Sequence, residues 1–489
     1  MTPLYLTSQI RTMEQAHGSA GLMEKAGLAA AELSRALLSE EADALLVLAG
    51  PGNNGGDALV AARHLRHDWH RVDVVFTGSA DKLPADASDA YDAWLACGGE
   101  VLAAIPAGKG YGLIIDGLFG IGLTRELDVR HRDIVRQVNA MDVTVLALDV
   151  PSGLDADTGR ILGCAIKADH TLAFLGLKPG LFTLDGPDHA GLVHVTDLGI
   201  EADPSGAQPG WLIDTPPTLP APRRRNSHKG SYGSAGILGG DTAMVGAALL
   251  AGRAALLAGA GRVYAGLLAE HAPVVDFGQP ELMLRSAGTL FDIAPFGVLA
   301  AGPGMGRSQR AEAALLRAIH TPAPLLLDAD ALHLIAANDQ LRDQFHQRTH
   351  GNILTPHPGE AAALLGCSVA EIQADRVASA LDIAQACNAI TVLKGCGSVI
   401  ATPDGRWFVN ASGNAGLASA GMGDVLSGLI AALVAQDMTP EAATLLGVYL
   451  HGAAADSLVG AGVGPVGLTA SEVAQEARDL LNQWIYGTR

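Results

Sequence analysis

The sequence has little positive charge. Of its 489 residues, 32 are Lys or Arg and 51 are Asp or Glu, so the formal net charge is −19. No general basic field is present to hold nucleic acid, and we expect no nucleic-acid partner; an anionic ligand must be held by local backbone donors. The densest basic run, residues 223–229, is interpreted as a solvated part of a linker, with contact to a ligand phosphate as the alternative.

Cysteines are few, and long apolar runs are missing. The cysteines lack C-x-x-C spacing, which argues against a zinc site and a disulfide framework. We therefore expect reduced thiols and a cytoplasmic location. No uninterrupted apolar run reaches about 18 residues, the length that spans a bilayer, and residues 1–6 lack the features of a targeting signal, so we expect no membrane partner. The five cysteines are Cys97, Cys164, Cys367, Cys387 and Cys396.

Apolar runs alternate with helical patterns through the first 200 residues. Runs that are apolar at nearly every position are typical of parallel strands covered on both faces. A chain of this length is expected to form two or three domains. The pattern predicts an α/β fold with strands at residues 45–49, 72–76, 113–116, 143–149 and 170–175.

A proline-rich seam separates two halves of this kind. Six prolines lie between residues 204 and 222. We predict domains at residues 1–205 and 227–489, joined by a linker at 206–226, with a Rossmann-like three-layer fold around a parallel sheet in the first. After the seam, strands are predicted at residues 235–240, 297–301, 324–328, 352–355 and 390–394.

One glycine-rich loop indicates a chemistry. Residues 413–424 read Gly-Asn-Ala-Gly-Leu-Ala-Ser-Ala-Gly-Met-Gly-Asp and lead into the apolar, helix-like stretch 425–434. N–H groups at a helix start bind anionic oxygens, and glycines let the backbone approach a phosphate closely. A carboxylate at that point can take a proton from a hydroxyl group. The loop therefore predicts phosphoryl transfer with Asp424 as the base.

A polar loop follows the first predicted strand. Residues 53–57, Asn-Asn-Gly-Gly-Asp, precede a helix predicted from residue 58, and they favour a ligand loop over a plain turn. Asp116 and Asp149-Val-Pro-Ser152 follow two further strands. Asn54, Asp116 and Ser152 together offer the hard oxygen ligands that a non-transition cation prefers, although each alone is equally suited to capping. No G-x-x-x-x-G-K-[ST] motif is present, which argues against a P-loop nucleotidase.

These motifs, with Leu22-Met-Glu-Lys-Ala-Gly27, resemble the epimerase domain of the NAD(P)H-hydrate repair enzymes. That family interconverts the R and S hydrates of NADH and NADPH, in which water has added at C6 of the nicotinamide ring. The resemblance implies that Asn54, Asp116 and Ser152 hold potassium and that Asp149 contacts the substrate. We take Asp149 as the candidate acid/base, because epimerisation needs a proton moved or a hydroxyl labilised without redox change, and a carboxylate suits that work. The hydrate would be bound by Asn53, Asn54, Gly55, Gly56, Asp57, Gly120, Ile121, Gly122, Leu123, Thr124, Arg125, Glu126 and Asp149.

Seven motifs of the second half, in order, resemble that family's dehydratase, whose fold is similar to ribokinase. They lie at residues 239–241, 245–248, 302–306, 327–332, 355–360, 394–398 and 414–424. The resemblance implies an epimerase at 1–205 and a ribokinase-like α/β dehydratase at 227–489. The hydrate would contact Ala247, Gly304, Gly306, His357 and Asp424. ADP would contact Lys394, Gly395, Cys396, Gly397, Ser398 and Gly423.

Two assignments in the second half remain open. His357 is equally suited to cap a helix. Asp328 and Asp330, at alternate positions of a strand end, would share one face and reach Mg²⁺ through water, but a strand-end aspartate often only caps the next helix. The resemblance favours ADP over ATP and implies NADHX and NADPHX as substrates. We also expect a homo-oligomer.

A C6 hydroxyl is a poor leaving group and a phosphate ester a good one, so phosphorylation can drive dehydration. The expected function is epimerisation of the hydrate followed by dehydration at the expense of ADP, giving AMP and phosphate. The alternative is a ribokinase-type small-molecule kinase fused to a non-catalytic binding module. The Asn414-Ala-Gly triplet and the polar strand ends of the first half favour the repair enzyme.

Overall fold

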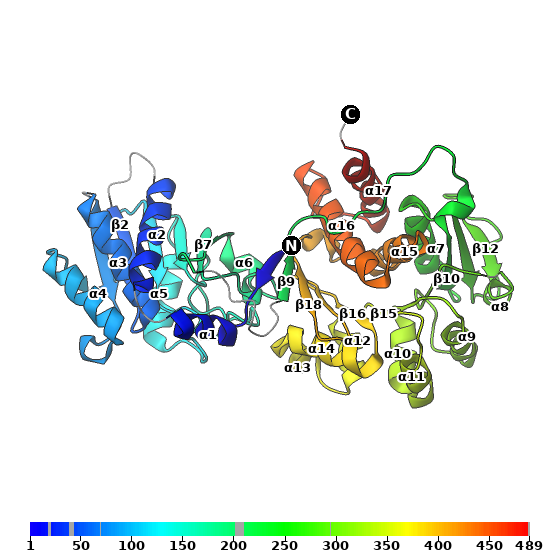
Figure 1. Ribbon diagram of the computed structural model, residues 1–489, viewed down its shortest axis with the longest axis horizontal. Helices are drawn as coiled ribbons and strands as arrows, with labels where there is room; N and C mark the ends of the chain where they lie inside the picture. The colour runs from blue at the N-terminus through cyan, green and yellow to red at the C-terminus, as the bar shows by residue number, and fades with distance from the viewer. Residues whose placement is uncertain (18–20, 39–43, 69, 201–209, 294, 488–489) are drawn as a thin grey trace. The chain divides into compact units, whose positions relative to one another are not determined.

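The computed structural model describes residues 1–17, 21–38, 44–68, 70–200, 210–293 and 295–487. The chain divides into two compact units, residues 2–210 and residues 211–489 with Met1 (Figure 1). The division falls inside the seam predicted as a linker at 206–226. Residues 206–209 of that seam lie outside the described residues, and the seam also holds the strand β9 (Gly210–Ile213).

The first unit contains a sheet in which every strand pairing is parallel. The strand order is β4-β3-β2-β5-β6-β7-β8. The five strands predicted in this half correspond to β2, β3, β5, β6 and β7. The elements are β1 (Thr2–Leu4), α1 (Thr7–His17), α2 (Leu22–Leu37), β2 (Ala44–Ala49), α3 (Asn53–His67), β3 (Arg71–Phe76), η1 (Ala80–Lys82), α4 (Ala85–Ala96), β4 (Val101–Leu102), β5 (Leu113–Gly117), α5 (Val129–Asn139), β6 (Val145–Leu148), β7 (His170–Phe174), η2 (Pro179–Leu181), α6 (Pro187–Ala190) and β8 (Leu192–Thr196).

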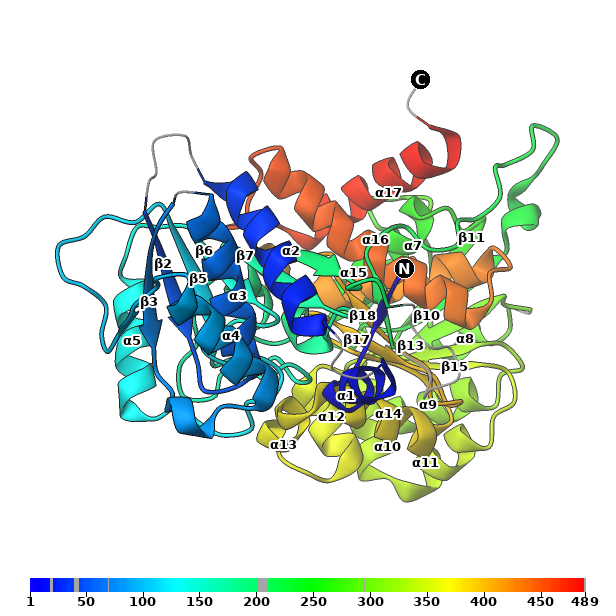
Figure 2. The same cartoon turned by 60° about the vertical axis from the view of Figure 1, so that its left-hand side comes forward.

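Both faces of this sheet are buried. Leu45 and Val47 of β2 belong to an apolar cluster with residues of α2, α3 and α4, which lie over the near face of the sheet in Figure 2. Leu46 and Leu48, the alternate residues of the same strand, pack with Ile134 and its neighbours on α5. Successive side chains of a strand point to opposite faces, so the continuous apolar run at 45–49 is explained and the predicted three-layer arrangement is confirmed.

The second unit also has a largely parallel sheet. Its strands follow the order β9-β18-β17-β16-β15-β14-β13-β10-β11-β12, with antiparallel pairing only where β17 meets β16 and β18. The elements after β9 are η3 (Lys229–Tyr232), β10 (Ser234–Gly239), α7 (Val245–Leu257), β11 (Arg262–Leu267), β12 (Met283–Ser286), α8 (Ala287–Leu290), β13 (Val298–Ala301), α9 (Gln309–Ile319), β14 (Leu325–Leu327), α10 (Asp330–Ala337), α11 (Asp339–His346), β15 (Asn352–Leu354), α12 (Pro358–Leu365), α13 (Val369–Ala374), α14 (Arg376–Cys387), β16 (Ile390–Leu393), β17 (Val399–Ala401), β18 (Trp407–Asn410), η4 (Ala415–Leu417), α15 (Met422–Ala435), α16 (Pro440–Gly460) and α17 (Ala470–Tyr486).

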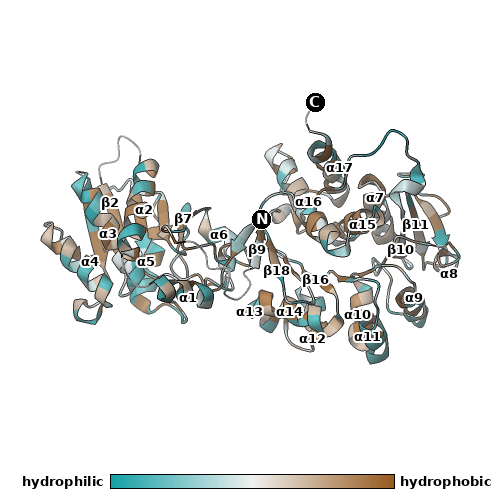
Figure 3. Ribbon diagram, in the orientation of Figure 1, coloured by the Kyte–Doolittle hydropathy of each residue, from teal (hydrophilic) through white to brown (hydrophobic). Residues whose placement is uncertain are grey.

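Helix α16 is long and apolar enough, by length and composition, to cross a membrane. In this unit 61% of its most apolar stretch is buried, and it shares one apolar cluster with α7, α15, α17 and the sheet. Apolar colouring is concentrated in the strands and the packed sides of the helices (Figure 3). Helix α16 therefore behaves as a core helix of the unit, and the predicted α/β fold class is confirmed for both halves.

Candidate active sites

The first unit holds a cavity of about 400 Å³ at the carboxyl ends of its strands. Ligands of parallel sheets bind at this edge. Eight of the residues expected to bind the hydrate line the cavity: Asn53, Asn54, Asp57, Gly120, Ile121, Gly122, Leu123 and Asp149. Thr124, Arg125 and Glu126 are not among its lining residues, so their contact with the ligand remains a prediction.

The predicted loop at 53–57 is the first turn of a helix, since α3 begins at Asn53. Gly55 and Gly56 are buried there, and a Cβ at Gly55 would lie 2.1 Å from the Gly50 carbonyl oxygen. These two glycines therefore permit close packing behind the cavity wall. The segment from Gly50, just before α3, to Gly55 also has a G-x-G-x-x-G spacing. In dinucleotide-binding folds this spacing places a phosphate at the helix start.

The Asp149 side chain is held by two hydrogen bonds. The backbone of this residue is in the left-handed region, with φ 67°. Lys178 donates from Nζ to Oδ1 at 2.5 Å, and the Ile121 N–H donates to Oδ2 at 3.2 Å. Lys178 was not predicted from the sequence, because its contact with Asp149 joins residues 29 positions apart and no local motif signals it.

Two further carboxyl groups line the same cavity. Burial raises the pKa of Asp57 well above its ordinary value, and the charges of Asp149 and Glu14 raise it further. Burial also raises the pKa of Glu14, with Asp149 adding to the effect and Lys178 opposing it. Glu14 lies on α1 and was not predicted, since a lone glutamate on an amphipathic helix resembles any solvated residue. The cavity thus groups three carboxyl groups, and the pKa values of two of them, Asp57 and Glu14, are raised.

Two of the three expected potassium ligands, Asp116 and Ser152, are buried and in contact. Asp116 accepts from the Ser152 hydroxyl at 2.7 Å and from the Ser152 N–H at 2.8 Å. Burial raises the pKa of Asp116 to about 6, although these hydrogen bonds lower it. Asn54 donates to the Leu148 carbonyl at 3.2 Å, while its own Oδ1 is buried without a partner among the described residues. An amide oxygen without a partner and a buried carboxylate are both hard oxygen donors of the kind that a cation such as K⁺ prefers, and binding of K⁺ by these residues remains a prediction.

The second unit brings several predicted residues to the start of α15. Asp424 lies in the first turn of this helix, after Gly421 with φ 85°. Burial raises the pKa of Asp424 to about 6; the charge of Asp328 adds to this effect and that of Lys394 opposes it. A Cβ at Gly423 would lie 3.3 Å from Lys394 Nζ, so this helix start faces the lysine ammonium.

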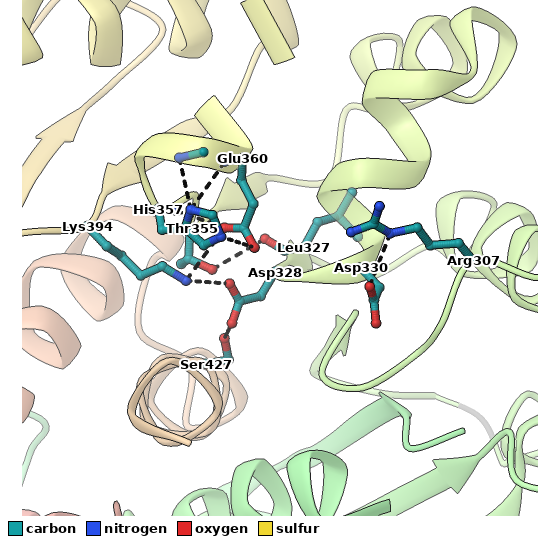
Figure 4. Close-up of polar contacts among 10 residues, drawn as sticks. Arg307, Leu327, Asp328, Asp330, Thr355, His357, Glu360, Lys394 and Ser427 are labelled. Carbon is teal, nitrogen blue, oxygen red and sulfur yellow. Dashed lines mark hydrogen bonds and ion pairs between the residues drawn. The ribbon is translucent and has the colours of Figure 1, made fainter. Parts of the chain in front are cut away.

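Lys394 is the centre of a buried polar network (Figure 4). Its Nζ lies 2.8 Å from Asp328 Oδ1 and 3.9 Å from Glu360 Oε2. The Ser427 hydroxyl of α15 donates to the other Asp328 oxygen at 2.8 Å. Asp328 thus orients both Lys394 and α15. The sequence predicted neither this role of Asp328 nor the proximity of Glu360 to Lys394.

The shared face expected for Asp328 and Asp330 is not observed. β14 ends at Leu327, so the alternation of a strand does not extend to either residue, and Ala329 between them has φ 49°. Asp330 accepts from the Gly306 N–H at 2.9 Å and lies on the Arg307 side, whereas Asp328 faces Lys394 (Figure 4). Asp330 therefore fastens the 302–306 loop, and the described residues include no group of three or more His, Cys, Asp or Glu side chains suited to a metal.

His357 caps α12, the alternative that the sequence left open. Its Nδ1 accepts from the N–H groups of Gly359 at 2.9 Å and Glu360 at 3.3 Å. The Glu360 carboxylate in turn accepts from the His357 N–H at 2.8 Å. The side chain is 53% exposed, so the capping role leaves it accessible, and contact with the hydrate remains a prediction.

The remaining predicted residues lie in two tight loops. A Cβ at Gly304, where φ is 57°, would lie 2.5 Å from the Met244 carbonyl oxygen and 3.1 Å from Ala247 Cβ, so this loop packs on the start of α7. In the other loop the Ser398 hydroxyl donates to the Gly395 carbonyl at 3.1 Å and accepts from its N–H at 3.3 Å. That closes residues 395–398, with Cys396 exposed, into a turn beside Lys394.

The fold and the sites define a two-domain α/β enzyme with separate chemistry in each domain. The second half matches the family model for NAD(P)H-hydrate dehydratase over residues 235–476. The first half matches the model for the YjeF-related protein N-terminus over residues 19–180.

Relatives of known description cover nearly the whole chain. The bifunctional NAD(P)H-hydrate repair enzyme Nnr of Escherichia coli K12 is 39% identical over 469 residues, which are 94% of this chain and 89% of that protein. The Nnr enzyme of Coxiella burnetii is 37% identical, over 99% of this chain and all of its own length. The chain belongs to the family of bifunctional NAD(P)H-hydrate repair enzymes.

One solved structure is similar to the second unit. The ADP/ATP-dependent NAD(P)H-hydrate dehydratase of Bacillus subtilis, co-crystallised with ATP and Mg²⁺, is 33% identical, with a TM-score of 0.50. The match covers 55% of this chain and 95% of the Bacillus chain. Nearly the whole Bacillus dehydratase chain thus corresponds to about half of this one.

Proposed function

We propose that this protein repairs NADHX and NADPHX by epimerising them in its first unit and dehydrating the S form with ADP in its second. Membership in the repair-enzyme family supports the pair of activities. The single observation that carries the dehydratase step is the half-buried Asp424 at the start of α15, facing a lysine that is fixed by Asp328. ADP rather than ATP is proposed because the two-domain order is typical of the ADP-using bacterial type.

In the dehydratase site, Asp424 accepts the proton of the C6 hydroxyl. The hydroxyl oxygen then forms a bond to the β-phosphorus of ADP while the bond to the bridging oxygen breaks and AMP leaves. The N–H groups at the start of α15 and the Lys394 ammonium stabilise negative charge on the transferring group. The phosphate departs with the electron pair of the C6–O bond, and loss of the C5 proton restores the ring double bond.

The described residues do not build a dedicated magnesium site. Both Asp328 oxygens already accept hydrogen bonds from Lys394 and Ser427, and Asp330 is bound to the Gly306 N–H. Mg²⁺ often binds through substrate phosphates and retained waters rather than through an all-protein cage. We therefore propose that Mg²⁺ enters with the nucleotide, and we assign no step of the reaction to it.

In the epimerase site, Asp149 exchanges a proton with the C6 hydroxyl group. Protonation of the hydroxyl lets it leave as water while the ring nitrogen donates its lone pair to C6. Water then adds to the opposite face and loses a proton, so no oxidant is needed. K⁺ bound by Asn54, Asp116 and Ser152 would fix the loop after β5 through the oxygen atoms described above.

The test is a direct assay of the pure protein. R-NADHX and S-NADHX are each mixed with ADP or with ATP, in KCl or in NaCl, and NADH absorbance is followed. We expect NADH from S-NADHX with ADP, and from R-NADHX at a rate limited by epimerisation and dependent on potassium. Absence of NADH with either nucleotide would refute the dehydratase, and failure of R-NADHX to yield NADH faster than its spontaneous exchange would refute the epimerase.

A further inference from the structure

Lys178 is fully buried, with 0% of its side chain exposed. It lies in the short segment between β7 and η2, and it is not among the residues that line the cavity. Lysine is rarely buried to this extent unless its ammonium is paired. Here Nζ donates to Asp149 Oδ1 at 2.5 Å and to the Phe174 carbonyl oxygen at 2.6 Å. Both acceptors are internal, so the lysine serves the protein's own architecture.

The contact is directed at the one carboxylate that both lines the cavity and carries the proposed acid/base role. Asp149 has its other oxygen bound to the Ile121 N–H at 3.2 Å, and its backbone N–H donates to the Leu172 carbonyl at 2.8 Å. A carboxylate offers about four acceptor positions. Lys178 and Ile121 therefore fix its orientation and leave acceptor positions for a ligand.

The charges around Asp149 explain why a cation is needed behind it. Glu14 and Asp57 line the same cavity and interact with Asp149 electrostatically. Arg11 also lines the cavity, but of the described residues Lys178 is the one cation that hydrogen-bonds to Asp149. Carboxyl groups in so small a space repel one another when ionised, and the Lys178 ammonium, which donates to Asp149 Oδ1, offsets this repulsion.

We propose that Lys178 is a positioning residue of the epimerase, which holds Asp149 in the orientation that reaches the C6 hydroxyl while making no contact with the substrate itself. This inference rests on the proposed epimerase function. A residue that controls the epimerase rate would then lie in the segment after β7, which none of the sequence motifs for this site includes.

The first test is Lys178→Met in the full-length chain, which keeps most of the side-chain length and removes the charge and the donors. We expect the kcat of epimerisation to fall about 100-fold, the scale of a disturbed acid/base, with KM for the hydrate within about threefold. Dehydration of S-NADHX by the same protein should be unchanged, which controls for the second unit. A circular-dichroism melting curve like that of the wild type controls for folding of the first unit. Lys167→Met, at an exposed lysine of the same unit, should leave both activities unchanged.

The second test restores the missing donor. Lys178→Ala should regain epimerase kcat when propylammonium is added, because that ion supplies the ammonium and the lost methylenes. Tetramethylammonium at equal concentration should give no recovery, because it carries the charge without N–H donors. Recovery with propylammonium alone supports positioning through hydrogen bonds. Equal rates in the two salts would overturn it, as would a rise of KM alone in Lys178→Met.

These outcomes are distinguishable from failure of the proposed function. If the wild-type protein does not exchange R-NADHX and S-NADHX, the epimerase assignment itself fails. If the wild type exchanges them and Lys178→Met does so at the same rate, only the role of Lys178 is wrong.

Discussion

At the residue scale, the ionisation state of Asp424 sets the pH range in which we expect the dehydratase to be active. Burial raises the pKa of this carboxyl to about 6, with Asp328 adding to the effect and Lys394 opposing it. The reaction needs the ionised form, which is lost as pH falls through this pKa. We therefore expect dehydratase kcat with ADP to be level near neutral pH and to fall about tenfold per pH unit below about 6. A steady-state profile of S-NADHX dehydration checks this.

The control for this profile is Asp424→Asn, which keeps the shape of the side chain and removes its basicity. The rate of dehydration should fall by about 10³-fold or more. Any residual rate should no longer show the fall in kcat at acidic pH. Epimerisation in the same protein should be unaffected. A limb that persists near pH 6 in Asp424→Asn would show that another group titrates.

Residues were predictable where a motif ties them to an element end. Asp149 follows a strand and Asp424 lies in the first turn of a helix, so the sequence pattern of apolar runs and glycine loops predicted where both would lie. Lys178 and Glu14 were missed for opposite reasons. A lysine is expected at the surface, and only the fold brings Lys178 to Asp149, whereas Glu14 gains its role only when α1 meets the cavity.

At the element scale, the start of α15 is the expected anion-binding surface. Gly423 lies in its first turn without a positive φ, and a Cβ there would lie 3.3 Å from Lys394 Nζ and 3.6 Å from Asp328 Oδ2. Both neighbours are side-chain tips, so Gly423→Ala should fold but crowd the nucleotide. We expect Kd for ADP to rise about tenfold with a thermal unfolding temperature close to the wild type, measured by titration calorimetry and a melting curve.

A matched control for that variant is Gly460→Ala at the end of α16, where a Cβ would meet no heavy atom within 4 Å. It should change neither ADP affinity nor the melting temperature. A Gly423→Ala protein that binds ADP normally would show that the phosphates lie elsewhere.

Strands were predictable where their own apolar residues indicate that both faces are buried. The apolar strands at 45–49 and 390–394 emerged as β2 and β16, because both faces of a parallel sheet are covered. β9 was missed inside the proline-rich seam, since it is a strand by pairing with β18, nearly 200 residues later. α3 begins at Asn53 rather than at residue 58, so the residues predicted as a ligand loop form the first turn of the helix.

At the scale of the whole molecule, the two activities reside in separate compact units. Each candidate site is built from residues of one unit alone, with Lys178, Asp149 and Asp57 in the first and Lys394, Asp328 and Asp424 in the second. A catalytic carboxylate of one unit should therefore be dispensable for the reaction of the other. We therefore expect the S hydrate to be released between the two steps.

This independence predicts complementation between two defective full-length proteins. Asp149→Asn should convert S-NADHX to NADH with ADP but leave R-NADHX to its spontaneous exchange, whereas Asp424→Asn should equilibrate R and S without forming NADH. Mixing the two should restore NADH formation from R-NADHX, because S-NADHX made by one protein diffuses to the other. The rate should rise with the concentration of either protein until it approaches that of the wild type. The measurement is NADH absorbance from pure R-NADHX with each variant alone and with both; a mixture no faster than Asp149→Asn alone would mean that the hydrate must pass between the sites of a single molecule.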